Sequence, residues 1–153
     1  MNEIYSALFA PIYEKLFGLY DSDFSLIFDH LYDKGGYIEF GLLFILTPLV
    51  CWSFFYYILK YPYGRIIHWL LCLIITIVVV SGSTYGVVRS EIFASNNEAL
   101  NNAIADASTN YETYVSSLSL KYAIFNGLLS GVWGFVCSLV MKRFSKIQIH
   151  LPF

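Results

Sequence analysis

The stretch from residue 66 to residue 88, IIHWLLCLIITIVVVSGSTYGVV, runs for 23 positions without an Asp, Glu, Lys or Arg. Two further windows are equally free of charge, residues 40–59 and residues 122–141, each of 20 residues. Because a helix rises about 1.5 Å per residue, any of the three spans the roughly 30 Å hydrocarbon layer of a bilayer. The sequence therefore predicts three transmembrane helices.

The composition of the 153-residue chain agrees with this interpretation. Apolar residues make up 58% of the chain and charged residues 13%, whereas soluble domains carry roughly a quarter charged residues. Three buried helices of a soluble protein are the alternative, but core helices normally keep a polar face. The predicted class is an all-α integral membrane protein.

The segments outside the windows also show helical patterns. Residues 1–36 hold two amphipathic stretches, one that begins at Pro11 and one with Phe24, Ile27 and Leu31 on a single helical face. Residues 90–120 predict a polar helical hairpin outside the membrane, with a capping box at Ser95 and Glu98 and a break at residues 106–110. The predicted boundaries are 1–36 for amphipathic interfacial helices, 37–60, 64–89 and 121–142 for the spans, 90–120 for the extramembrane segment and 143–153 for a basic C-terminal tail.

Charge is divided unequally between the two sides that three spans create. One side holds residues 1–39 and 89–121, with all eleven acidic residues and four basic ones, while the other carries five basic residues and no acidic residue. Because Lys and Arg in short loops mark the cytoplasmic side, we expect a cytoplasmic C-terminus and an outside N-terminus. The predicted location is the cell inner (plasma) membrane, as a multi-pass protein.

Small residues recur at helix-packing spacing in the second and third windows. In lipid, close approach of helix backbones drives helix association, so a Gly-x-x-x-Gly pattern indicates tight packing. Packing within one chain and packing between chains both fit the pattern, and we expect a homo-oligomer because three helices offer few partners for two such faces. The candidate packing and oligomer residues are Gly82, Gly86, Gly127, Gly131 and Gly134.

Polar residues inside the predicted spans are candidates for the lining of a pore. Asn126 is the most polar of them, and a lone amide in lipid needs a hydrogen-bond partner. Either Asn126 is a buried link between helices, or it lines a wet lumen together with hydroxyl-bearing residues. The candidate pore-lining residues are Thr76, Ser83, Asn126 and Ser130.

Aromatic and basic residues crowd the predicted cytoplasmic ends of the spans. The rings, which include Trp52, Tyr56 and Trp69, predict a belt at the membrane surface. The basic residues either contact anionic membrane lipid or, in a ring of copies, bind a polyanion such as a nucleotide or oligonucleotide. These candidate contacts are Lys60, Arg65, Lys142, Arg143 and Lys146.

The chain shows no motif for catalysis, for a cofactor or for a metal. HExxH, GxSxG and a Gly-rich phosphate loop are all missing from the sequence. Cys51, Cys72 and Cys137 lie inside the predicted spans at spacings that match no metal motif. We therefore expect no enzyme, no cofactor and no metal site.

The leading functional expectation is a small homo-oligomeric membrane pore or ion-channel-like effector, such as a membrane-disrupting protein of bacterial antiviral defence or lysis. An outside N-terminus, three spans and a basic tail resemble, in topology alone, the three-span phage holins, although residues 90–120 are longer than a holin needs. The alternative is a non-conducting membrane scaffold, immunity protein or accessory subunit of a larger complex. In that case the N-terminal helices contact a protein partner.

Overall fold

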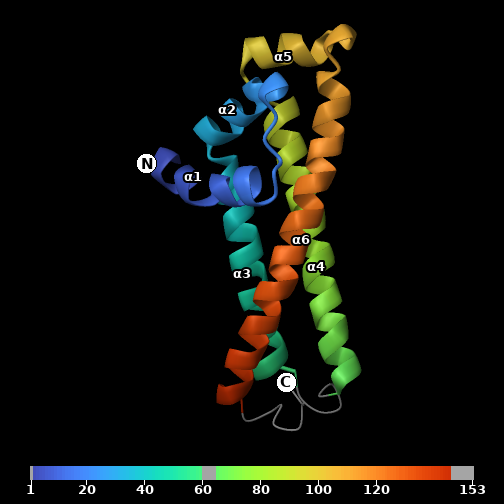
Figure 1. Ribbon diagram of the computed structural model, residues 1–153. Coiled ribbons are helices and arrows are strands. Elements are labelled where there is room, and N and C mark those ends of the chain that lie inside the picture. The colour runs from blue at the N-terminus through green and yellow to red at the C-terminus, as the bar shows by residue number, and fades with distance from the viewer. Residues whose placement is uncertain (1, 60–64, 146–153) are drawn as a thin grey trace.

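Three long helices form a bundle, as Figure 1 shows for the computed structural model. The structure describes residues 2–59 and 65–145, with the backbone alone for residues 2–6, and these residues form helices without any strand. Helices α3 (Gly36–Tyr57), α4 (Ile66–Phe93) and α6 (Tyr111–Phe144) are each long and apolar enough to cross a membrane. The all-helical class with three candidate spans is thereby confirmed.

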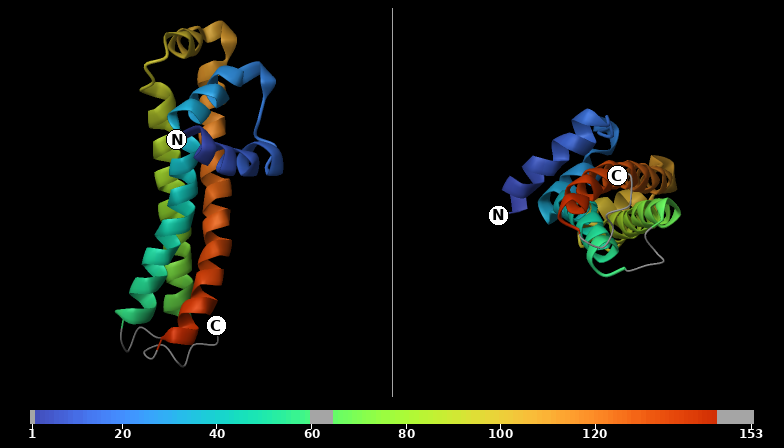
Figure 2. Two further views of the ribbon diagram at one scale, coloured as in Figure 1. Left: turned by 90° about the vertical axis from the view of Figure 1, so that its left-hand side faces the viewer. Right: turned by 90° about the horizontal axis from the view of Figure 1, so that it is seen from below.

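Helix α6 is the central element of the bundle, because it packs against both α4 and α3 along their length (Figures 1 and 2). The indole Nε1 of Trp133 on α6 donates a hydrogen bond of 3.2 Å to the Ile45 carbonyl oxygen on α3. Pro48 lies one turn further along α3, which continues as a helix through it. Most large side chains on the outer faces of the three helices are apolar and exposed, as a lipid-facing surface requires.

The N-terminal segment crosses the bundle instead of extending it. Helix α1 (Asn2–Pro11) continues into a π-helical turn, η1 (Ile12–Leu16), and the two lie across the long helices (Figure 2). The chain then turns back through η2 (Ser22–Phe24) into α2 (Ser25–Lys34). Gly35 joins α2 directly to α3 with a φ of 85°, a left-handed conformation that glycine adopts without steric cost.

A helical head caps one end of the bundle and consists of residues 19–35 and 89–121. It combines α2, the end of α4, α5 (Glu98–Ala105), η3 (Ala107–Thr109) and the start of α6 (Figure 1). Phe24 stacks on Tyr114 with ring centroids 3.8 Å apart, and the apolar face of α2 is covered by the head itself. The fully buried core of the head consists of Ile27, Leu31, Ile92, Leu100, Val115 and Leu118.

The start of α5 differs from the prediction. Its N-cap is Asn97, whose Oδ1 accepts hydrogen bonds from the backbone N–H groups of Ala99 and Leu100 at 3.1 and 3.3 Å, so the predicted capping box at Ser95 is wrong by two residues. Ser95 lies in the turn of residues 94–97 that leads the chain away from α4. Its hydroxyl donates a hydrogen bond to the Asn101 side chain. The break predicted at residues 106–110 is present, and Asn110 there has a φ of 59°.

Candidate functional site

A buried polar hub lies where the N-terminal segment meets the three long helices, and Asn126 of α6 is at its centre. The Asn126 side chain is fully buried, and its Oδ1 accepts a hydrogen bond of 2.8 Å from the Tyr13 hydroxyl. Its Nδ2 donates to the Phe40 carbonyl oxygen of α3 at 3.1 Å and to the Thr84 Oγ1 of α4 at 2.7 Å. One amide therefore connects four elements: η1, α3, α4 and α6.

The π-helical turn η1 supplies the polar residues that cover this hub. Tyr13 is fully buried, and burial raises the pKa of its hydroxyl far above the ordinary value, so the hydroxyl stays protonated and able to donate. The neighbouring Glu14 is half-buried, and its Oε1 accepts a hydrogen bond of 2.6 Å from the Tyr37 hydroxyl. The Tyr37 hydroxyl also lies 3.2 Å from that of Tyr122. An extra residue in this turn thus places two successive side chains over the bundle, which agrees with the frequent location of π-turns at functional sites.

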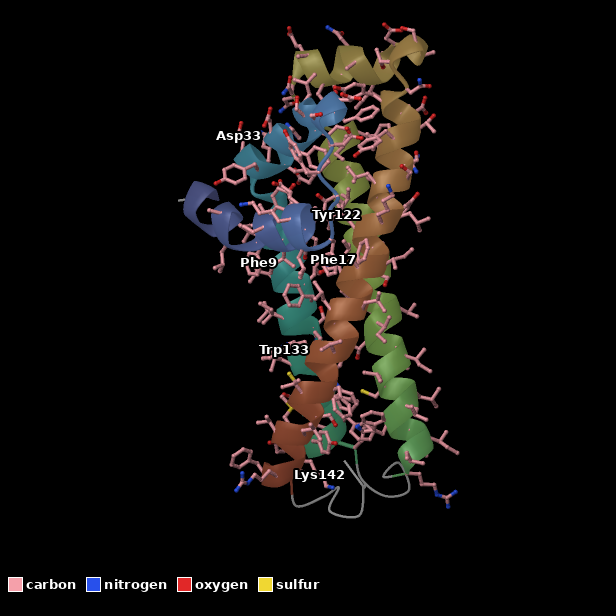
Figure 3. The ribbon with its side chains drawn as sticks, viewed as in Figure 1. Phe9, Phe17, Asp33, Tyr122, Trp133 and Lys142 are labelled. Atoms are coloured by element: carbon pink, nitrogen blue, oxygen red, sulfur yellow. The ribbon has the colours of Figure 1, made fainter. Side chains whose placement is uncertain are left out.

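Aromatic rings surround the hub and keep it from water. Tyr13 contacts the rings of Tyr37, Phe40 and Tyr122 with centroids 5.3–6.0 Å apart, and Phe17 stacks on Phe125 at 4.3 Å. Phe17 and Tyr122 lie close to each other at the crossing of the N-terminal segment and α6 (Figure 3). A polar network closed off in this way fixes helix positions strongly, because an unpaired buried group is costly.

A glycine on α3 lets helix α1 approach the bundle. A Cβ at Gly41 would come within 2.5 Å of the Phe9 ring, so only glycine leaves room for this ring. Phe9 also packs edge-on against Phe44 with centroids 6.2 Å apart. The neighbouring Leu8 side chain is 65% exposed, so it does not share this contact with the bundle.

The third-span glycines all face the interior of the chain. A Cβ at Gly127 would clash with the Ser81 hydroxyl of α4, and one at Gly131 would lie 3.0 Å from the Ile77 side chain. A Cβ at Gly134 would lie 2.8 Å from the Trp52 indole nitrogen of α3. The Gly-x-x-x-Gly pattern of α6 therefore packs α6 against its own α4, and Gly134 packs it against α3.

The second-span glycines behave in the opposite way. Gly82 and Gly86 are exposed on α4, and among the described residues nothing lies within 4 Å of a Cβ placed at either position. The two predicted small-residue faces thus have different surroundings in one chain. One is used for internal packing, and the other is free.

The four candidate pore-lining residues do not share one surface. Thr76 and Ser130 are fully buried, and each hydroxyl donates to a carbonyl of its own helix, Cys72 O at 2.8 Å and Gly127 O at 2.7 Å. Asn126 is fully buried in the hub, and only Ser83 is half-exposed. Among the described residues, Thr76, Asn126 and Ser130 support packing within the chain, and Ser83 lies apart from them on the surface.

At the end opposite the head, a second polar contact joins the three long helices. The Ser138 Oγ on α6 lies 2.8 Å from the Tyr56 hydroxyl of α3 and accepts a hydrogen bond of 2.7 Å from Trp69 Nε1 of α4. Trp52, Tyr56 and Trp69 are at most 5% exposed, so the predicted surface belt is wrong for these rings. They are buried because Ser138 and Gly134 leave space for them in α6.

The basic candidates gather at this same end of the molecule. Arg65 and Arg143 are exposed and Lys142 is half-buried, while Lys60 and Lys146 lie outside the described residues. Figure 3 shows Lys142 and Asp33 at opposite ends of the molecule. We refer to this end as the basic end.

The head carries a polar cleft between α2 and the α4–α5 connection. Two adjoining hollows of about 370 and 250 Å³ share His30, Lys34 and Asn96. The His30 Nε2 lies 3.1 Å from the Glu91 carbonyl oxygen, which fixes α2 against the end of α4. In the described part of the chain no group of three or more His, Cys, Asp or Glu residues is arranged to hold a metal ion.

Sequence reasoning identified Asn126 but missed its partners. The residues it missed are Tyr13, Glu14, Tyr37, Thr84 and Tyr122 in the hub and Phe9 with Gly41 beside it. The one signal was the Asn126 amide itself, which requires polar groups nearby when it lies in an apolar helix. The sequence does not show which distant residues supply those groups. The chain matches no protein-family model, and neither a curated protein nor a solved structure is detectably similar to it.

Proposed function

We propose that the chain is a multi-pass protein of the cell inner (plasma) membrane, with α3, α4 and α6 inside the bilayer. The head and the N-terminus lie outside, and the C-terminus lies in the cytoplasm. The distribution of charge supports this orientation, because the described residues of the basic end carry Arg65, Lys142 and Arg143 and no acidic side chain. Alkaline extraction of membranes and protease digestion from either side test the insertion and the orientation.

Within that membrane we propose a docking role, as a non-conducting scaffold, immunity protein or accessory subunit. The observation that supports it is the closed hub, in which Asn126 makes three hydrogen bonds within its own chain. A conducting path needs polar groups that face water. In this bundle Thr76, Asn126 and Ser130 are fully buried and bonded within the chain.

The head is the surface that we propose for docking. Its residues 19–35 and 89–121 include eight acidic and three basic side chains, a net charge of −5. Six of the eight carboxylates are exposed, and Asp29 and Asp33 border the polar cleft. A partner with a basic surface fits this charge, since complementary potentials speed and orient association. Within the N-terminal segment, the polar side of α2 contacts the partner, because the apolar side of α2 is buried inside the head.

Site-specific crosslinking tests the docking role. A photoreactive amino acid at Asp33, on the head, should give a heteromeric adduct in the cells that make the protein. The same group at Val132, which is 69% exposed on α6 within the spans, is the matched control and should give none. Adducts that contain only copies of the chain, or equal adducts at both positions, would contradict docking through the head.

A homo-oligomeric pore is the second candidate, and one observation favours it. Gly82 and Gly86 leave a small-residue face of α4 open, and Ser83 beside them is half-exposed. Two copies that meet through this face would place Ser83 near a lumen between chains. A polyanion regulator at the basic end belongs with this candidate, because only a ring of copies concentrates Arg65, Lys142 and Arg143.

A further inference from the structure

An apolar groove lies between α3 and α4 towards the basic end of the molecule. Its volume is about 430 Å³, within the range of roughly 300–1,000 Å³ that small-molecule sites occupy. Its walls are almost entirely carbon, with two thiols among them. The lining includes Cys51, Phe54 and Phe55 of α3 and Leu71, Cys72 and Ile75 of α4.

The position of this groove limits what can fill it. All six of these residues lie in the uncharged windows 40–59 and 66–88, so in the proposed membrane orientation the groove faces hydrocarbon. It opens on the outer surface of the bundle, where Phe54 is 50% exposed and Ile75 is 56% exposed. An empty groove would leave these side chains without dispersion contacts, and an acyl chain supplies them.

The same end of α4 offers a site for the phosphate of that lipid. Arg65 is exposed at the N-cap of this 28-residue helix, and its own side chain makes no capping hydrogen bond there. A helix N-terminus attracts anions through its backbone N–H groups and its dipole. His68, one turn further on, lines the groove, so the anion site and the apolar wall follow each other along α4.

We propose that this groove binds one acyl chain of an anionic phospholipid whose phosphate lies at Arg65 and the N-terminus of α4. The inference rests on the proposed insertion of α3, α4 and α6 in the membrane. A lipid held there differs from the ordinary lipids around the bundle, because the groove joins a concave apolar wall to the positive end at Arg65.

Native mass spectrometry of the full chain, released from nanodiscs that contain equal amounts of phosphatidylglycerol and phosphatidylcholine, tests the proposal. We expect one phosphatidylglycerol molecule to stay bound to each chain. Ile75→Trp fills the groove and should remove it, whereas Ile74→Trp is the matched control, because Ile74 is 54% exposed on the same helix but does not line the groove. Arg65→Gln should reduce the preference for the anionic lipid about fivefold, as expected for one basic residue near a membrane surface.

The native thiols give a second measurement that needs no variant. Cys51 and Cys72 line the groove, whereas Cys137 is buried at 4% exposure and serves as the internal reference. Alkylation of Cys51 and Cys72 by N-ethylmaleimide should be slower in phosphatidylglycerol nanodiscs than in phosphatidylcholine nanodiscs, while Cys137 should react equally slowly in both.

Three results would overturn the lipid site. The first is that no lipid is retained and the thiols react equally fast in the two lipids. The second is that Ile75→Trp and Ile74→Trp retain lipid equally. The third is that the protein forms lipid-free dimers that only Ile75→Trp abolishes. The last would assign the groove to a second copy of the chain. A chain that fails to enter nanodiscs at all would instead refute the proposed membrane insertion, so the two failures are distinguishable.

Discussion

Asn126 shows how much one polar residue can organise in an apolar bundle. Its three hydrogen bonds reach residues 13, 40 and 84, which are 113, 86 and 42 positions away in the chain. No local interaction brings these segments together, so the hub forms only when the whole bundle packs. Sequence reasoning predicted that this amide needs a partner, and it left open whether the partner is another helix or water. The partners themselves are set by tertiary packing, which a one-dimensional pattern does not contain.

Replacing Asn126 with Leu should destabilise the single chain. The change removes three hydrogen bonds of roughly 0.6–2 kcal/mol each, so we expect the free energy of unfolding in micelles to fall by about 2–6 kcal/mol. Denaturant titration followed by circular dichroism measures it. Ser83→Leu is the control, because Ser83 is half-exposed on α4, and equal stability of the two variants would refute the hub.

Asn97→Ala should weaken the head without affecting the spans. The change removes the cap that accepts from the N–H groups of Ala99 and Leu100, and such caps contribute about 1 kcal/mol. Hydrogen exchange should become faster in α5 and stay unchanged in α3. Unchanged exchange in α5 would show that α5 does not depend on this cap.

At the level of whole elements, α4 and α6 carry the same glycine pattern with different consequences. Gly127 and Gly131 contact Ser81 and Ile77 across the α4–α6 interface, whereas a Cβ at Gly82 points into open space. The pattern predicts tight packing, and this is present in α6. The pattern does not say which of the two faces turns inward, because that depends on how three helices rotate against each other.

The two glycine pairs should therefore respond differently to bulky substitution. Gly127→Ile with Gly131→Ile should force α6 away from α4 and unfold the single chain, which near-ultraviolet circular dichroism detects. Gly82→Ile with Gly86→Ile should leave that spectrum unchanged and alter only contacts with other molecules. The interior placement of Gly127 and Gly131 would be contradicted if the first double variant kept the wild-type spectrum and melting temperature.

Helix α1 is the element that sequence reasoning placed least well. The sequence predicts an amphipathic helix that begins at Pro11, whereas α1 ends at that residue and the chain continues as the π-helical turn η1. The close approach of Phe9 to Gly41 and the burial of Tyr13 depend on contacts with α3 and α6, which the helix period alone does not specify. Likewise, α2 shows its apolar face in the sequence but not that the head covers it.

Phe9→Ala should loosen the N-terminal segment from the bundle. The Phe9 ring fills the space over Gly41 and contacts Phe44, so its loss should make residues 12–20 more sensitive to limited proteolysis. Leu8→Ala is the matched control on the exposed side of the same helix. Equal cleavage rates in the two variants would refute the packing of α1 on α3.

For the molecule as a whole, three properties act together: a closed bundle, an acidic head and a basic end. The three candidate spans and the unequal distribution of charge follow from the sequence alone, because hydropathy and charge act over whole segments. The closure of the bundle does not follow from the sequence, since Thr76, Asn126 and Ser130 are as suited to a wet lumen as to a packed interior. Their burial within one chain favours a docking protein over a pore.

The central claim is that the closed bundle does not conduct ions, and ion flux through liposomes tests it most directly. The purified protein, separated by oligomeric size, is reconstituted in vesicles loaded with an ion-sensitive dye, beside the Gly82→Ile and Gly86→Ile double variant. We predict flux no greater than that of protein-free vesicles for every size fraction of both proteins. Flux from a wild-type oligomer that the double variant abolishes would contradict the account and establish a pore built on the open face of α4.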